Sequence, residues 1–120
     1  MRHVLATITF ACCMFTPLIL TMDVEAGSGG ADLFKTHCVP CHGQDGKGTD
    51  LGKQLAAMTE GVEFPDFTSV EWQEKETDER MTEQIKNGSP GRMFSFKDKM
   101  NEEEIKAVIV YVRGFPSRQK

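Results

Sequence analysis

The chain has 120 residues, of which 27% are charged and 39% hydrophobic, so it fits one compact domain and leaves no room for two. Its formal net charge is −4. That charge gives no support to a nucleic-acid-binding protein, because such proteins usually carry a basic face. An acidic domain instead meets its partners through modest, salt-sensitive charge complementarity.

Residues 1–26 have the layout of a secretory signal peptide. A short basic start is followed by the mostly apolar residues 4–20 and then by small residues that end at Ala26. We therefore expect cleavage after Ala26, export to the periplasm, and a mature domain of residues 27–120. A retained membrane anchor is the alternative, because residues 4–22 are about long enough to cross a bilayer at roughly 1.5 Å per residue.

The first predicted helix leads directly into a cysteine motif. Residues 27–30 are glycine-rich and residues 31–36 are compatible with a helix, which continues into Cys38-Val39-Pro40-Cys41-His42. This C-x-x-C-H pattern is that of covalent haem attachment. On a helical turn, the spacing lets both thiols reach the vinyl groups on one edge of a porphyrin and points the histidine at the iron. We predict one haem c, attached through Cys38 and Cys41 and ligated by His42.

Three other interpretations of this motif are weaker. A disulfide between Cys38 and Cys41 leaves the placement of His42 unexplained. A zinc site lacks ligands, since cleavage leaves no third cysteine and the only histidines are His37 and His42. A dithiol oxidoreductase would suit the proline at position 40, but that chemistry requires a βαβ sheet for which the chain has no strands.

Residues 43–73 are predicted to be mostly loop, because glycines and a proline interrupt any periodicity. A short helix is expected at 51–58. The aromatic residues Phe64, Phe67 and Trp72 are expected to pack against the haem, with the Trp72 N–H reaching a propionate. Three cations could guide partners or meet a propionate, although lone charges are usually only solvated: Lys47, Lys53 and Arg92.

The next predicted helix begins after Thr77, which is an N-cap candidate followed by two acidic residues. Met81 and Ile85 share one face of it, and Asn87-Gly88 ends it.

The last helix carries the clearest signals in the sequence. Asn101 is its N-cap, Glu104 completes a capping box, and Met100 against Ile105 forms a hydrophobic staple. Gly114 marks its end. Its apolar face comprises Ile105, Val108, Ile109 and Val112. Since no stretch shows sustained alternation, we expect an all-α domain of about three main helices packed around one haem.

A sixth iron ligand must come from the methionines of the mature chain, which are Met58, Met81, Met93 and Met100. Met93 lies in a glycine- and proline-bearing loop, residues 89–96, that can turn a side chain inward. Met81 is accounted for by its helix face and Met100 by the staple, as ordinary core methionines are. Met93 is therefore the predicted distal ligand.

The sequence resembles the class I cytochromes c, which are small single-haem electron carriers, over residues 30–115. Four segments carry the resemblance: Gly30 with Phe34 in the first helix, residues 38–48 with the haem motif and a glycine-rich turn, residues 85–98 with the ligand methionine, and residues 103–113 in the last helix. The resemblance implies the family's fold, thioethers at Cys38 and Cys41, and axial ligation by His42 and Met93.

Two departures from the family pattern concern the haem ligands. Phe94 stands where many members have a proline after the axial methionine. A loop proline whose carbonyl often accepts from the second nitrogen of the histidine is replaced by residues 49–52, Thr-Asp-Leu-Gly. Some acceptor is still expected to fix the ring, because such bonds orient metal ligands.

These observations predict an electron carrier and not an enzyme. Iron with both axial positions filled by protein changes oxidation state without binding substrate. We expect a soluble monomer that meets redox partner proteins, in particular membrane-bound respiratory complexes, with only transient membrane contact. Two alternatives are a cytochrome subunit of a larger dehydrogenase or oxidase, and a haem protein with an open iron that binds a small ligand.

Overall fold

The structure is a computed structural model that describes residues 28–119, so the predicted signal peptide at 1–26 lies outside the described residues. Within residues 28–119 the regular elements are all helical, which confirms the all-α class. No helix in this range is long and apolar enough to cross a membrane. The helices are α1 Ser28–His37, α2 Val39–His42, α3 Asp50–Ala57, α4 Val70–Lys75, α5 Asp78–Asn87, α6 Glu102–Arg113 and the 3-10 helix η1 Pro116–Gln119.

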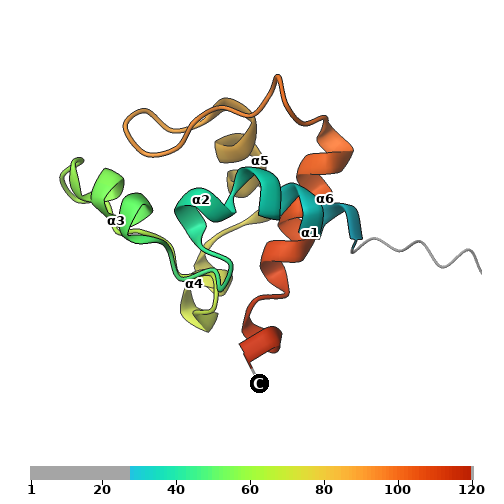
Figure 1. Cartoon of the computed structure of the whole chain (residues 1–120), viewed down its shortest axis with the longest axis horizontal. Helices are drawn as coiled ribbons and strands as arrows, with labels where there is room; N and C mark the ends of the chain where they lie inside the picture. Colours follow the sequence, from blue (N-terminus) through green and yellow to red (C-terminus); the bar gives the residue numbers. More distant parts are fainter. Residues whose placement is uncertain (1–27, 120) are drawn as a thin grey trace, which may run out of the picture.

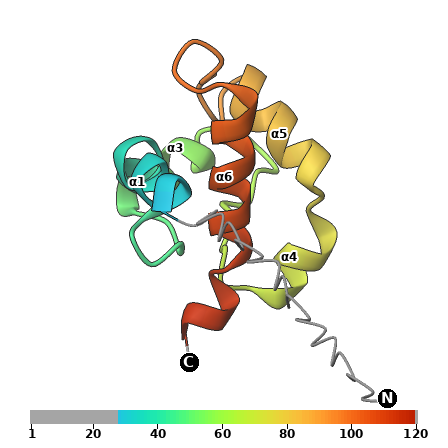
Figure 2. The ribbon, with the colours of Figure 1, turned by 90° about the vertical axis from the view of Figure 1, so that its right-hand side faces the viewer.

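Three longer helices, α1, α5 and α6, form the frame, and the shorter helices lie around it. α1 crosses α6 closely, and α5 packs against the other side of α6 (Figure 1). Turned by 90°, the molecule shows α6 in the middle, with α1 and α3 on one side and α4 and α5 on the other (Figure 2). This arrangement matches the expected three main helices.

The crossing of α1 and α6 depends on Gly30. A Cβ built on Gly30 would lie 2.7 Å from the carbonyl carbon of Ala107 and 3.3 Å from the Cβ of Tyr111. One turn further along α1, the ring of Phe34 lies 5.2 Å from that of Tyr111 and 5.2 Å from that of Phe115, measured between centroids. Phe34 is 2% exposed. The glycine therefore lets the backbones approach, and the aromatic residue fills the contact that results.

The predicted caps of α5 and α6 are confirmed. Asn101 accepts from the backbone N–H of Glu104, and the Glu104 carboxylate accepts from the N–H of Asn101, so the capping box is complete. The Met100 and Ile105 side chains are both buried in the core. At the start of α5, the Thr77 hydroxyl accepts from the N–H of Arg80 at 3.2 Å. Local hydrogen bonding thus fixes where both helices begin.

The prediction of mostly loop over residues 43–73 is wrong at its end, where α4 forms. Its first turn is capped by Ser69, whose hydroxyl accepts from the N–H of Trp72 at 3.2 Å. Only six residues long, α4 shows no apolar periodicity, and it is held by tertiary contacts. Arg113 of α6 donates to the carbonyls of Gln73 and Glu76 at 2.7 and 2.6 Å, which ties the end of α4 to the long helix.

The core lies between α1, α5 and α6. Its largest fully buried side chains are Phe34, Phe115, Ile105 and Val108. α5 contributes Met81 and Ile85 to the core, and Met100 enters it just before the start of α6. The core is open on one side, where several of its members also form the wall of a large cavity.

The close contact at Gly30 predicts that one added methyl group there lowers the stability of the fold markedly. Gly30→Ala should lower the free energy of unfolding by about 1–3 kcal/mol, because overpacking of this order forces the two helices apart. Gly29→Ala is the matched control: among residues 28–119, its added Cβ would meet no atom within 4 Å outside its own helix, and alanine favours helix over glycine. Thermal denaturation followed by circular dichroism measures both variants. Equal melting temperatures for the two would contradict the role of Gly30.

Candidate cofactor site

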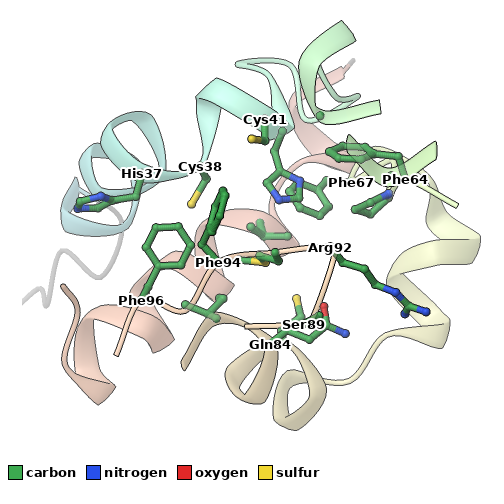
Figure 3. Close-up of a pocket in the computed structure, with 18 of the residues that line it drawn as sticks. His37, Cys38, Cys41, Phe64, Phe67, Gln84, Ser89, Arg92, Phe94 and Phe96 are labelled. Carbon is green, nitrogen blue, oxygen red and sulfur yellow. The ribbon is translucent and has the colours of Figure 1, made fainter. Parts of the chain in front are cut away.

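A cavity of about 620 Å³ opens between the α1–α2 turn, α5, α6 and the loop that follows α5. Cys38 and Cys41 project into it from one side, and Phe94 and Phe96 face them from the other (Figure 3). Its volume lies within the range of small-molecule and cofactor sites, roughly 300–1,000 Å³. All four residues predicted to bind the haem lie in its wall: Cys38, Cys41, His42 and Met93.

The two cysteines are presented by one continuous helical path. The N–H of Cys38 donates to the carbonyl of Phe34 at 2.8 Å, and the N–H of His42 donates to the carbonyl of Cys38 at 2.8 Å. Both thiols are free, so no disulfide joins them in the structure. Burial, together with the nearby Cys41 thiol, raises the pKa of Cys38 to about 12 and keeps it a neutral thiol.

His42 is held between two aromatic rings. Its imidazole stacks on Phe67, with centroids 4.7 Å apart and planes 19° from parallel, and lies 5.1 Å from the ring of Phe64. Burial lowers the pKa of His42 to about 4, so that at neutral pH the ring is uncharged and has a free lone pair for a metal.

The acceptor expected for the second nitrogen of His42 is not found among the described residues. Nδ1 is shielded from solvent and has no hydrogen-bond partner within this part of the chain. A buried polar nitrogen without a partner is uncommon in folded proteins and marks a functional position. Here the aromatic packing of Phe64 and Phe67 defines the position of the ring.

The position of Phe64 depends on glycine at positions 48 and 52. A Cβ on Gly48 would lie 2.6 Å from the Phe64 ring, and one on Gly52 would lie 2.8 Å from it. Gly48 also has a backbone φ of +85°, which residues other than glycine rarely adopt. Two glycines, one in the turn after the motif and one in the first turn of α3, are therefore needed to seat an aromatic ring beside His42.

Thr49 ties the start of α3 to the cysteine motif. Its hydroxyl oxygen accepts from the N–H of Gly52 at 3.1 Å and lies 2.9 Å from the carbonyl oxygen of Pro40 and 3.2 Å from that of Cys41. Thr49 thus both caps α3 and anchors it to α2. Residues 49–52 stand where the family often has a loop proline. In this chain the Thr49 side chain connects that segment to the cysteine motif.

The backbone of Phe67 is held by a hydrogen bond from α4. The Gln73 side-chain amide donates to the carbonyl of Phe67 at 2.8 Å and to that of Val112 at 3.1 Å. Arg113 in turn donates to the side-chain oxygen of Gln73 at 2.9 Å. α4 and α6 therefore share the task of holding the ring that stacks on His42.

Met93 reaches the cavity from the loop between α5 and α6. The N–H of Ser89 donates to the carbonyl of Met93 at 2.9 Å, and the N–H of Met93 donates back to the carbonyl of Ser89 at 3.0 Å. This pair closes a tight loop with Pro90, Gly91 and Arg92 at its tip. Met93 is half-buried and lines the cavity. The loop thus directs its thioether inward without a proline at position 94.

The other three methionines of residues 28–119 differ in whether they line the cavity, and the sequence did not indicate which of them does. Met58 is 81% exposed, and Met100 is buried outside the cavity wall, so neither faces the site. Met81, however, is both a core residue and part of the cavity wall, together with Ile85 one turn later. The i, i+4 spacing of Met81 and Ile85 predicted a buried face of α5. It did not show that a cavity lies against that face.

The charged side chains at the cavity are two carboxylates, Glu63 and Glu76, and three cations. Arg80 lies with its Nε 3.2 Å from Oε1 of Glu76, and both residues line the cavity, as do Arg92 and Lys99. Trp72 lines it too, whereas Lys47 and Lys53 are not among the lining residues, and their positive charges help to lower the pKa of Asp66. Of the three cations considered from the sequence, only Arg92 borders the site.

Comparisons with known proteins agree with this geometry. The family model of cytochrome C oxidase, cbb3-type, subunit III, matches residues 25–112. The cbb3-type cytochrome c oxidase subunit FixP of Azorhizobium caulinodans is 31% identical over 91 residues, 75% of this chain, and subunit CcoP of Cereibacter sphaeroides is 29% identical over 93 residues, 77% of this chain. The matched segment spans only 27% and 28% of those two relatives.

Solved structures give the same result at higher identity. The KustC0563 c-type cytochrome superposes with a TM-score of 0.63 and is 46% identical, over 72% of this chain and 95% of that one. A point mutant of that cytochrome superposes with a TM-score of 0.63 at 47% identity, over 72% of this chain and 98% of the mutant chain.

Fold, site and comparisons together define a class I cytochrome c, an electron-transfer domain with covalently bound haem c. The chain belongs to the cytochrome c oxidase, cbb3-type, subunit III family. The resemblance noted in the sequence and the predicted cofactor are thereby confirmed.

The residues present suit this cofactor. Two free thiols stand on one helical turn at one edge of the cavity, an uncharged imidazole lies beside them, and the rest of the lining is mainly apolar and aromatic. A thioether sulfur reaches the same cavity from Met93 and another from Met81. This donor set matches the sulfur and nitrogen ligands that haem iron takes in cytochromes c.

The cavity predicts that the chain depends on its haem to fold. Phe67, Ile85 and Val108 belong both to the core and to the cavity wall, so without haem the core is hollow. Apolar side chains left facing this cavity lose the burial that would stabilise them, and the whole stability of a small domain is only roughly 5–15 kcal/mol. Chain prepared without haem should show weak helical circular dichroism and no cooperative melt. Near-native helix content with a cooperative transition would contradict this.

Proposed function

We propose that the chain is a soluble single-haem electron carrier, exported to the periplasm after removal of residues 1–26. In this proposal Cys38 and Cys41 form the thioether bonds, His42 is the proximal ligand and Met93 the distal one. The convergence of these four side chains on one cavity is the observation that carries it.

When bound, the haem supplies a one-electron couple, Fe³⁺/Fe²⁺, and the protein sets how that couple behaves. The chain's own residues hold the iron between a nitrogen and a sulfur ligand and surround it with apolar side chains that exclude water. A thioether favours the reduced metal and raises the potential. With His42 and Met93 both bound to the iron, no coordination site would be left to solvent, so small ligands would not compete with electron transfer.

A free carrier is favoured by the solved structures. The KustC0563 c-type cytochrome is matched over 95% of its chain, so that protein consists of little more than this one domain. The exposed surface of the present chain also carries many charges of both signs, which suits transient encounters with membrane-bound respiratory complexes more than a permanent interface. We expect a monomer that acts as a carrier, without catalysis of its own.

A subunit of a larger oxidase is the second candidate. The observation in its favour is that FixP and CcoP are named as subunits of cbb3-type cytochrome c oxidases and match most of the present domain. Haem chemistry and ligands would be the same in either case. The two functions differ in whether the domain leaves its electron-accepting partner.

A haem-stained extract of the native host tests attachment and free diffusion together. On denaturing electrophoresis, the haem should stay with a band of the mature chain, because thioethers survive denaturation. On gel filtration, the same haem should elute at the size of a monomer. Cys38→Ser and Cys41→Ser should each sharply lower the yield of stained protein. Haem that is lost on denaturation would refute attachment, and elution with a large complex would favour the oxidase subunit.

A pair of leucine variants tests the distal ligand. Met93→Leu and Met81→Leu each remove a sulfur that lines the cavity while nearly keeping the side-chain volume, so packing costs should stay below about 1.5 kcal/mol. The oxidised protein should show a weak sulfur-to-iron charge-transfer band at the red end of its spectrum. Met93→Leu should abolish the band, admit cyanide or carbon monoxide, and lower the reduction potential. Met81→Leu should keep the band.

The reverse result, with the band lost in Met81→Leu and kept in Met93→Leu, would move the ligand to α5 and leave the carrier function intact. A wild-type protein that lacks the band and binds carbon monoxide readily would instead support the open-iron alternative.

A further inference from the structure

The loop that carries Met93 extends from the end of α5 toward α3, as the orange segment after α5 in Figure 1 shows, and its residues 92–96 line the cavity. Its tip consists of Pro90, Gly91 and Arg92, all exposed. The tip therefore buries little apolar surface of its own, and the position of the loop depends on a small number of polar contacts.

Most of those contacts hold the loop to its own base. Ser89 and Met93 bond to each other, the Ser95 hydroxyl donates to the carbonyl of Lys86 at 2.8 Å, and the N–H of Phe96 donates to the carbonyl of Ile85 at 2.9 Å. All these partners belong to the loop or to the end of α5. They would remain intact if the whole loop tip swung away from α3.

One hydrogen bond crosses to the opposite wall. The hydroxyl of Thr59 donates to the carbonyl of Gly91 at 3.0 Å, between residues 32 positions apart in the chain. Thr59 is itself well placed to act as an anchor, because its N–H donates to the carbonyl of Ala56 at 3.0 Å at the end of α3. Within residues 28–119, no other hydrogen bond joins this loop tip to the α3 side.

Packing around this bond is sparse. A second hollow, of about 650 Å³, lies between the end of α3 and the loop, and its walls include Leu55 and Met58 on one side and Phe94 on the other. Met58 and Phe94 are 81% and 73% exposed. Little apolar contact therefore joins the loop tip to the end of α3, and the Thr59–Gly91 hydrogen bond links the two directly.

We propose that Thr59 is a positioning residue for the distal ligand. Its hydroxyl latches the loop tip at Gly91, two residues from Met93, and so keeps the Met93 thioether in the cavity. The role of Thr59 in ligation rests on the proposed assignment of Met93, whereas its role in holding the loop does not.

Thr59→Val and Thr59→Ser form the test, carried out on the haem-loaded protein. Valine keeps the shape and removes the hydroxyl, whereas serine keeps the hydroxyl. A hydrogen bond contributes about 0.5–1.5 kcal/mol, so its loss should raise the open population of the loop by roughly two- to ten-fold. Thr82→Val is the matched control, because its hydroxyl bonds only within α5, to the carbonyl of Asp78 at 2.7 Å.

Two readouts separate the latch from the ligand. Trypsin cleavage after Arg92, at the exposed loop tip, reports loop opening whatever binds the iron. The rate of cyanide binding to the ferric protein reports release of the sixth ligand. Thr59→Val should accelerate both by a similar factor, while Thr59→Ser and Thr82→Val should match the wild type.

Wild-type rates of cleavage and cyanide binding in Thr59→Val would overturn the latch and leave the Met93 assignment standing. Equal acceleration in Thr59→Val and Thr59→Ser would overturn it as well, since the hydroxyl would then not be the cause. Faster cleavage with unchanged cyanide binding would show that loop opening does not free the sixth position. That result overturns the positioning role of Thr59, and the Met93→Leu variant then tests the ligation by Met93 separately.

Discussion

The close crossing of α1 and α6 is the contact on which the rest of this structure depends. It is possible because Gly30 lets the backbone of α1 approach Ala107, and because Phe34 then fills the space against Tyr111 and Phe115. The same α1 continues through Cys38 into the turn that carries His42. Fixing α1 on α6 therefore fixes the attachment motif relative to the core, and it sets the edge of the cavity that receives the cofactor.

The cavity and the core cannot be separated in this molecule. Buried side chains of α5 and α6 serve both, so the haem is the missing part of the hydrophobic core as well as the redox centre. A small domain buries a limited fraction of its surface, and a large apolar group at its centre makes up for that. Stability and electron transfer thus rest on the same contacts, because the side chains that exclude water from the iron are those that hold the helices together.

The two walls of the cavity differ in rigidity. On the His42 side, Phe67 stacks on the imidazole and is itself held by Gln73 and Arg113, and Thr49 joins the motif to α3. On the Met93 side, a loop with an exposed tip faces α3 across a hollow. The His42 wall is thus tied to the rest of the fold at more points than the Met93 wall. Under the proposed ligation, changes at the iron are expected to begin with movement of the loop that bears Met93.

The sequence by itself determined the class, the cofactor motif and the ends of the best-capped helices, because these depend on residues close together in the chain. The spacing of Cys38, Cys41 and His42 and the capping box of Asn101 with Glu104 are complete within a few positions. Only the tertiary structure decided that α4 forms, that Met81 reaches the cavity, and that Thr59 meets Gly91. Each of these depends on segments far apart in the chain whose approach is set by the packing of α1, α5 and α6, and no local pattern of residues records that packing.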